Sequence, residues 1–245
     1  MTDQQHFAEL IAASSKIAGF TGAGISTESG ISDYRSQGGI WDKFQPVYLD
    51  DFIHDEKKRK LYWERKISLW DSLKNASPGT AHLFFNSLHE KGKLHGIITQ
   101  NIDGLHEKSG LPQESIINLH GTSLEIVCLS CGDLQPADGF MEKLNLSHKS
   151  PLCSKCGGLL KPNTISFGQN LRGRDLEDAE RLARECDLMI AAGSTLVVHP
   201  AASFPVIAKQ HGAKLVIITL SETPLDGAAD LVINEPLGSF LQYFL

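Results

Sequence analysis

The chain has 245 residues, 41% of them hydrophobic and 21% charged, and a formal net charge of −6 at pH 7. These values are ordinary for a globular protein and exclude the disordered and fibrous classes. The acidic balance disfavours non-specific nucleic-acid binding and is compatible with basic protein segments as partners. Because no apolar run reaches about 18 residues and the N-terminus lacks a basic region, we expect a cytoplasmic protein without membrane insertion or export.

The predicted elements alternate between strands and helices. Apolar runs of strand length cover 16–21, 94–99, 187–192 and 214–220, and amphipathic helical patterns cover 81–90, 175–184 and 200–211. Nearly continuous apolar strands are typical of a sheet buried on both faces. Strands that alternate with helices favour right-handed crossovers, so we predict an α/β fold with a doubly wound, Rossmann-like parallel sheet.

Two segments interrupt this alternation and predict a smaller lobe. The first is helix-like and contains Trp63 and Trp70, which we expect in a core, and the second is rich in cysteines and turn formers. We therefore expect a discontinuous Rossmann-like domain of residues 1–45, 78–121 and 162–245, a helical insertion of residues 46–77, and a zinc-ribbon insertion of residues 122–161.

A glycine-rich turn follows the first predicted strand. Gly22, Ala23 and Gly24 would let backbone N–H groups approach a pyrophosphate at the start of a helix. The dehydrogenase fingerprint requires a third glycine where this chain has Thr27, so hydride transfer is disfavoured. An ordinary strand-to-helix turn remains the alternative interpretation.

Polar residues also follow the second and third strands. Gln100, Asn101 and Asp103 come after one strand, and Gly193–Thr195, including Ser194, comes after another. The carboxyl ends of parallel strands form the ligand-binding edge of such a sheet, which predicts one shared pocket. Alternatively, Asn101 and Asp103 only form a turn and cap a helix.

The cysteine pattern predicts a metal site. Four of the five cysteines form two C-x2-C pairs separated by 21 residues: Cys128, Cys131, Cys153 and Cys156. Two such turns complete a tetrahedral sulfur shell around zinc, and a closed shell indicates a structural ion. The fifth, Cys186, is expected to be a small buried hydrophobe. The nearest candidate for catalysis is then His120, which titrates near neutral pH.

Taken together, these motifs resemble those of the sirtuins, NAD-dependent protein lysine deacylases. The matching segments occur in the family's order over nearly the whole chain: 22–26, 30–35, 99–106, 120–121, the four cysteines, 167–168 and 193–195. The resemblance implies NAD and zinc as cofactors and acyl-lysine proteins or peptides as partners. It also implies acyl transfer to NAD, with free lysine, nicotinamide and O-acyl-ADP-ribose as products.

The resemblance also implies a role for each matching residue. His120 matches the catalytic base. The NAD loop is matched by Gly22, Ala23, Gly24 and Arg35, the nicotinamide and ribose pocket by Gln100, Asn101 and Asp103, and the adenosine side by Gly193, Ser194, Thr195, Thr219 and Ser221. Phe167, Gly168 and Val198 lie in segments similar to those that clamp the substrate peptide by β-augmentation.

The chain departs from the family pattern at Ser32, Gln169 and Thr219, which replace the usual proline, glutamate and asparagine. None of these changes removes a catalytic group. Tyr62 and Arg65 stand three residues apart, so on a helix they share a face and could bind an acyl carboxylate, as in relatives that remove succinyl or malonyl groups. The alternative is an amphipathic helix with Tyr62 inward and Arg65 solvated.

Two other functions remain open from the sequence. A mono-ADP-ribosyltransferase would cleave NAD in the same way with a different acceptor. A binding module would use the cysteine lobe to recognise a partner without any turnover. Longer acyl chains than acetyl also stay possible substrates.

Overall fold

A computed structural model describes residues 1–34, 38–40, 44–144 and 150–245. Its main body is a six-stranded parallel sheet in the order β3-β2-β1-β7-β8-β9. The strands are β1 Ile17–Thr21, β2 Leu94–Thr99, β3 Ile116–Asn118, β7 Leu188–Ala192, β8 Lys214–Ile218 and β9 Leu231–Ile233. The predicted doubly wound α/β sheet is confirmed. The short strands β3 and β9 extend it at either edge.

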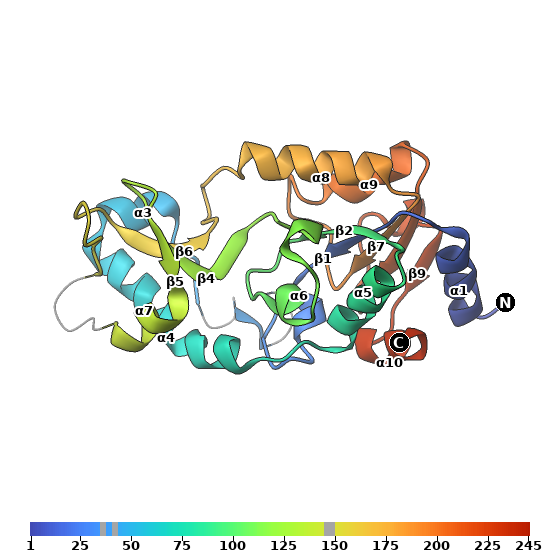
Figure 1. Ribbon diagram of the computed structural model, residues 1–245, viewed down its shortest axis with the longest axis horizontal. Coiled ribbons are helices and arrows are strands. Elements are labelled where there is room, and N and C mark those ends of the chain that lie inside the picture. The colour runs from blue at the N-terminus through green and yellow to red at the C-terminus, as the bar shows by residue number, and fades with distance from the viewer. Residues whose placement is uncertain (35–37, 41–43, 145–149) are drawn as a thin grey trace.

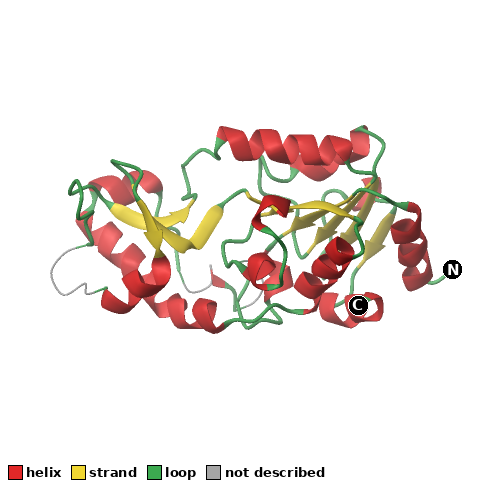
Figure 2. Ribbon diagram, viewed as in Figure 1, coloured by secondary structure: helices red, strands yellow, loops and turns green. Residues whose placement is uncertain are grey.

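Helices cover both faces of this sheet (Figures 1 and 2). On one face lie α8 Gly173–Glu185 and α9 Ser203–Gln210, and on the other lie α1 Asp3–Ala13, α5 Thr80–Glu90 and α10 Leu237–Leu241. Each face has its own core because alternate residues of a strand point to opposite sides. Phe20 packs toward α8 and α9, whereas Ile17 packs with Phe7, Phe84 and Phe240.

A smaller lobe lies at the far end of the molecule from both termini (Figure 1). Its antiparallel sheet has the order β5-β4-β6, with β4 Gly121–Cys128, β5 Leu134–Pro136 and β6 Leu160–Thr164. Its helices are α3 Leu49–His54, α4 Glu56–Asn75 and α7 Ala137–Lys143. The core of this lobe contains Trp63, which is fully buried, and Trp70 packs against it, as predicted for both tryptophans.

Some element boundaries differ from the prediction. The predicted strand 214–220 ends at Ile218, although the Thr219 N–H still donates to the Ile233 carbonyl oxygen of β9, and the chain bends at Leu220. A short helix, α6 Leu105–Lys108, follows the polar residues after β2. Among the described helices, none combines the length and apolar character needed to cross a membrane.

Candidate functional site

The turns after β1 and β7 pack backbone to backbone. The Gly24 N–H donates to the Gly193 carbonyl oxygen at 2.9 Å. A Cβ added to Gly22 would lie 2.7 Å from the Gly193 oxygen, and one added to Gly24 would lie 2.8 Å from the Gly193 Cα. Gly193 itself has a φ of +63°. Glycine is therefore required at these positions so that the two turns can pack against each other at the edge of the cavity.

Replacing Gly193 with alanine is expected to disrupt this contact. The new Cβ would lie 2.5 Å from the Ile25 backbone nitrogen, so the two turns must separate. We expect a loss of about 2 kcal/mol of stability and a decrease of at least about tenfold in NAD affinity, measured by thermal melting and calorimetric titration. Gly212→Ala is the control, because Gly212 also has a positive φ but faces open space. Equal effects of both variants on NAD affinity would contradict the argument.

Asn101 is held between the glycine turn and the end of β2. Its Nδ2 donates to the Gly22 carbonyl oxygen at 3.1 Å and to the Ser26 Oγ at 3.3 Å. Its backbone N–H donates to the Thr99 Oγ1 at 3.0 Å. The side chain is 8% exposed and lines the cavity described below. With its amide NH2 fixed in this way, the orientation of the Asn101 side chain is set before any ligand binds.

Asp103 lies behind this pocket and does not line the cavity formed by the described residues. Its carboxylate accepts hydrogen bonds from the Ser26 Oγ at 2.7 Å and from the Leu105 N–H at 3.0 Å. Burial raises the pKa of the Asp103 carboxyl, and these hydrogen bonds oppose the increase. Asp103 thus binds the first N–H of α6 and holds Ser26, which in turn accepts from Asn101. It shapes the pocket through its neighbours.

His120 follows β3 and is oriented by a main-chain carbonyl. Its Nδ1 lies 2.9 Å from the Gln100 carbonyl oxygen. Because that oxygen only accepts hydrogen bonds, the neutral imidazole carries its proton on Nδ1 and keeps a lone pair on Nε2. Burial lowers the pKa of His120, and the hydrogen bond to Gln100 partly offsets the decrease. The side chain is therefore prepared to accept a proton at neutral pH.

These residues surround one cavity of about 1280 Å³ between the two lobes. Its floor is the carboxyl edge of the large sheet, and its opposite wall comes from α4 and from the segment after β6. His120 lies along the same cavity as the glycine turns. The predicted site residues that line it are Gly22, Ala23, Gly24, Tyr62, Arg65, Gln100, Asn101, His120, Phe167, Gly168, Gly193, Ser194, Thr195, Val198, Thr219 and Ser221.

Helix α4 lines the cavity with three polar side chains. Burial raises the pKa of Tyr62 to about 12 and lowers the pKa of Lys66 to about 8. The Lys66 Nζ lies 5.5 Å from the centroid of the Tyr62 ring. The Arg65 guanidinium donates to the Gln45 carbonyl oxygen, and its central carbon lies 5.1 Å from the centroid of the Phe44 ring. Tyr62 and Arg65 thus share the cavity wall, and Arg65 is not simply solvated.

Sequence reasoning missed several residues of the cavity, and one predicted residue cannot be placed. Arg35 lies outside the described residues. The missed residues include Lys66 on α4, Thr164 at the end of β6 and Glu235 just after β9. Glu235 follows a strand of the parallel sheet, so the strand-end rule would have found it if the three-residue strand β9 had been recognised.

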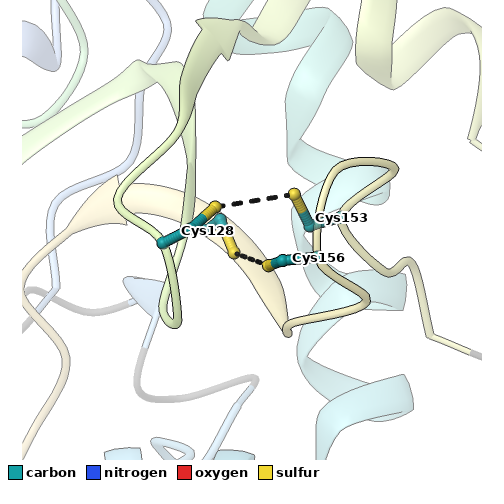
Figure 3. A group of neighbouring side chains, drawn as sticks. Cys128, Cys153 and Cys156 are labelled. Carbon is teal, nitrogen blue, oxygen red and sulfur yellow. Dashed lines mark hydrogen bonds between the residues drawn. The ribbon is translucent and has the colours of Figure 1, made fainter.

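The sulfur atoms of the four cysteines lie close together, as Figure 3 shows for the labelled Cys128, Cys153 and Cys156. The sulfur atoms of Cys128 and Cys156 lie 3.5 Å apart, those of Cys131 and Cys153 lie 3.9 Å apart, and all four lie within 4.8 Å of one another. Sulfur atoms about 2.3 Å from a central zinc ion in a tetrahedron are separated by about 3.8 Å. The cluster therefore has the size and donor set of a zinc site.

Each C-x2-C turn is closed by a glycine with left-handed backbone. Gly132 has a φ of +71° and Gly157 a φ of +74°, a conformation that favours glycine. The cluster is not part of the cavity lining. Four thiolates fill the coordination shell, so the ion would stabilise the small lobe and leave no open position for a substrate.

Comparison with known proteins identifies the family. The model of the Sir2 family matches residues 22–200. An NAD-dependent protein deacetylase of Rhodopseudomonas palustris is 42% identical over 241 residues, which cover 98% of this chain and 95% of the relative. The protein of the same name from Sulfolobus acidocaldarius is 38% identical, and the alignment covers 96% of this chain and 90% of the relative.

Solved structures agree with these sequence relatives. A Sir2 protein with a deacetylated p53 peptide and 3′-O-acetyl ADP-ribose superposes with a TM-score of 0.89 at 36% identity, covering 98% of this chain and 96% of the other. A Sir2 protein bound to a propionylated peptide gives a TM-score of 0.87 at 36% identity, covering 99% of this chain and 97% of the other. The chain belongs to the Sir2 family.

Proposed function

We propose that this protein removes acyl groups from lysine side chains of proteins and transfers them to the ADP-ribose part of NAD. The observation that carries the proposal is the position of His120, whose imidazole lines the same cavity as the glycine turns on one side and α4 on the other. The relatives are named NAD-dependent protein deacetylases, and one solved relative contains an acetyl ADP-ribose.

NAD, when bound, supplies nicotinamide as a leaving group and a ribose hydroxyl as the acyl acceptor. The chain's own residues fit this ligand. The turns at Gly22, Gly24 and Gly193 line the cavity and would accommodate the pyrophosphate. Asn101 presents an amide to the nicotinamide end, and Thr219 and Ser221 present hydroxyls to the adenosine end. His120 accepts the proton of the ribose hydroxyl through Nε2, while Gln100 holds its Nδ1–H.

The acyl-lysine side chain is proposed to enter from the opposite side, toward α4. Phe167, Gly168 and Val198 line the same cavity, and their main chains would pair with an extended peptide. Pairing through the main chain gives little selectivity for the sequence around the lysine. A ligand that fills the cavity would limit the access of water to the reacting ribose.

The proposal is tested with matched acetyl-lysine and succinyl-lysine peptides. We expect nicotinamide release that requires both NAD and an acylated peptide, measured by liquid chromatography. Nicotinamide release without loss of the acyl group would instead support ADP-ribosyl transfer. No consumption of NAD would support the binding module.

Acyl preference is expected to depend on Tyr62 and Arg65. If they bind a terminal carboxylate, the double variant Tyr62→Phe, Arg65→Met should lower kcat/KM for a succinyl peptide by at least about tenfold. The value for an acetyl peptide should change less than about threefold, because an acetyl group has no carboxylate to lose. Equal losses of kcat/KM for both peptides would show that Tyr62 and Arg65 support the structure of α4 and do not bind a carboxylate.

The pH dependence should reflect the lowered pKa of His120. A base with a lowered pKa stays neutral to a lower pH, so its activity is retained below the ordinary histidine value of about 6.5. The acidic limb of log(kcat/KM) against pH is therefore expected to fall below pH 6.5. An acidic limb centred above pH 7 would contradict this environment for His120.

A further inference from the structure

Lys108 joins the end of α6 to the carboxyl end of α4. The Lys108 Nζ, at the end of α6, donates to the carbonyl oxygens of Leu73 at 3.4 Å, Lys74 at 3.0 Å and Ala76 at 3.1 Å. These carbonyls belong to the last turn and cap of α4. Helix carboxyl ends carry unpaired acceptors and a partial negative charge, so an ammonium group is favoured there.

The two elements joined by this lysine carry different halves of the proposed site. Helix α4 carries Tyr62, Arg65 and Lys66 along the cavity wall. Helix α6 begins at Leu105, whose N–H donates to Asp103, and Asp103 follows the cofactor-side residue Asn101 by two positions. The Nζ contact therefore joins the acyl-side helix to the element that follows the segment that would hold nicotinamide.

The last turn of α4 is also tied to its own lobe. The Lys74 Nζ lies 2.7 Å from carboxylate oxygens of both Asp138 and Glu142 on α7. The backbone carbonyl of the same Lys74 accepts from Lys108 of the large lobe. Lys74 at the end of α4 thus contacts both lobes: its side chain binds α7 of the small lobe, and its backbone carbonyl accepts from Lys108 of the large lobe. In Figure 1, this end of α4 extends toward the large lobe.

We propose that Lys108 is a positioning residue that fixes α4, and with it the acyl pocket, relative to the cofactor-binding segment. The proposal rests on the proposed deacylase function for its kinetic consequences. Loss of the contact leaves both half-sites formed, but it loosens the last turns of α4 and lets the helix shift relative to the cofactor-binding segment. A misplacement of this kind weakens the binding of the acyl-lysine substrate. The binding of NAD should change little, because the glycine turns and Asn101, which is held by Gly22, stay in place.

The chain contains a matched control for this lysine. The Lys93 Nζ donates to the carbonyl oxygens of Ile11 at 2.7 Å, Ala12 at 3.1 Å and Ser14 at 3.0 Å, at the end of α1. The chemistry is the same, one ammonium on three carbonyls at a helix end. Helix α1 contributes no residue to the cavity wall formed by the described residues.

The kinetic test compares Lys108→Met with Lys93→Met. For Lys108→Met we expect the KM for an acetyl-lysine peptide to rise at least about fivefold and the KM for NAD to change less than about twofold. For Lys93→Met we expect both values to stay within about twofold, although its melting temperature falls. Lys108→Arg should restore most of the peptide KM, because a guanidinium also donates to several carbonyls. Unchanged kinetics in Lys108→Met would make Lys108 an ordinary helix cap and overturn the proposal.

Hydrogen exchange provides a readout that does not require activity. In Lys108→Met, amides of the last two turns of α4 should exchange at least about tenfold faster than in the wild-type protein. In Lys93→Met, only the end of α1 should do so. Unchanged exchange in α4 overturns the role of Lys108 even if deacylation is observed. Faster exchange in a protein that removes no acyl group would refute the proposed function but keep the link between α6 and α4.

Discussion

Replacing His120 with alanine is expected to lower the rate of deacylation about 10³-fold, because general-base catalysis contributes about 10²- to 10⁴-fold. The imidazole Nε2 is the free acceptor of a side chain whose Nδ1 is held by the Gln100 carbonyl oxygen. The variant should still bind NAD within about threefold of the wild-type affinity, because the glycine turns and Asn101 do not depend on the imidazole. Single-turnover assays and calorimetric titration of NAD measure the two quantities.

The matched control is His95→Ala. His95 lies near the amino end of β2, whereas the cavity lies at the carboxyl edge of the sheet. Its Nε2 lies 3.0 Å from a carboxylate oxygen of Glu185. The rate of deacylation in His95→Ala should stay within about twofold of the wild-type rate, because His95 does not line the cavity. The folded state should also persist, since exposed pairs of this kind contribute little to stability. A protein that keeps full activity without His120 would contradict the assignment of the base.

Loss of the metal is expected to unfold the small lobe. Replacing Cys153 with alanine removes one of four thiolates that lie within 4.8 Å of one another. A structural zinc site contributes its binding energy directly to folding. We expect about one zinc ion per wild-type chain and almost none in the variant, with a melting temperature lower by about 10 °C or more. Elemental analysis and calorimetry provide the measurements.

The remaining cysteine supplies the control for that experiment. Cys186 is only 5% exposed and lies in the core beneath α8. Its Sγ lies 3.4 Å from the Ala183 carbonyl oxygen. Cys186→Ala should keep the zinc content of the wild-type protein. Its melting temperature should fall only slightly, because the substitution removes one small buried sulfur atom. If Cys153→Ala retained zinc and melted like Cys186→Ala, the cluster would not be a zinc site.

Much of the large domain could be predicted because its strands are long and apolar on both faces. The segments 16–21 and 187–192 needed only that composition to be recognised as buried parallel strands. By contrast, β3 and β9 have three residues each, too few to show a period. Helix α1 was also not predicted, although Thr2 and Gln5 form a capping box at its start.

The candidate site was predictable where it follows from strand ends. Gln100, Gly193 and Thr219 each come directly after a strand of the parallel sheet, so the topology brings them to one edge. By the same rule we expected Asp103 at the cavity surface, but it lies behind it. The sequence does not show that α6 begins at Leu105 and that the Asp103 carboxylate binds its first N–H.

The rest of the site arises from tertiary packing. Lys66 and Thr164 reach the cavity because the small lobe leans over the sheet edge, and no local pattern encodes that placement. The contact of Lys108 with α4 joins residues more than thirty positions apart through backbone carbonyls, which any sequence provides. Only the packed structure shows that these carbonyls lie at the end of the helix that carries Tyr62.

The central claim is that the acyl group passes from lysine to the ADP-ribose of NAD, and mass spectrometry of the reaction products tests it most directly. With an acetyl-lysine peptide and NAD, we predict free lysine peptide, nicotinamide and O-acetyl-ADP-ribose in equal amounts, and formation of the free lysine peptide and O-acetyl-ADP-ribose about 10³-fold slower with His120→Ala. ADP-ribose attached to a protein or peptide that keeps its acetyl group, or an acetyl group lost without NAD, would contradict the account.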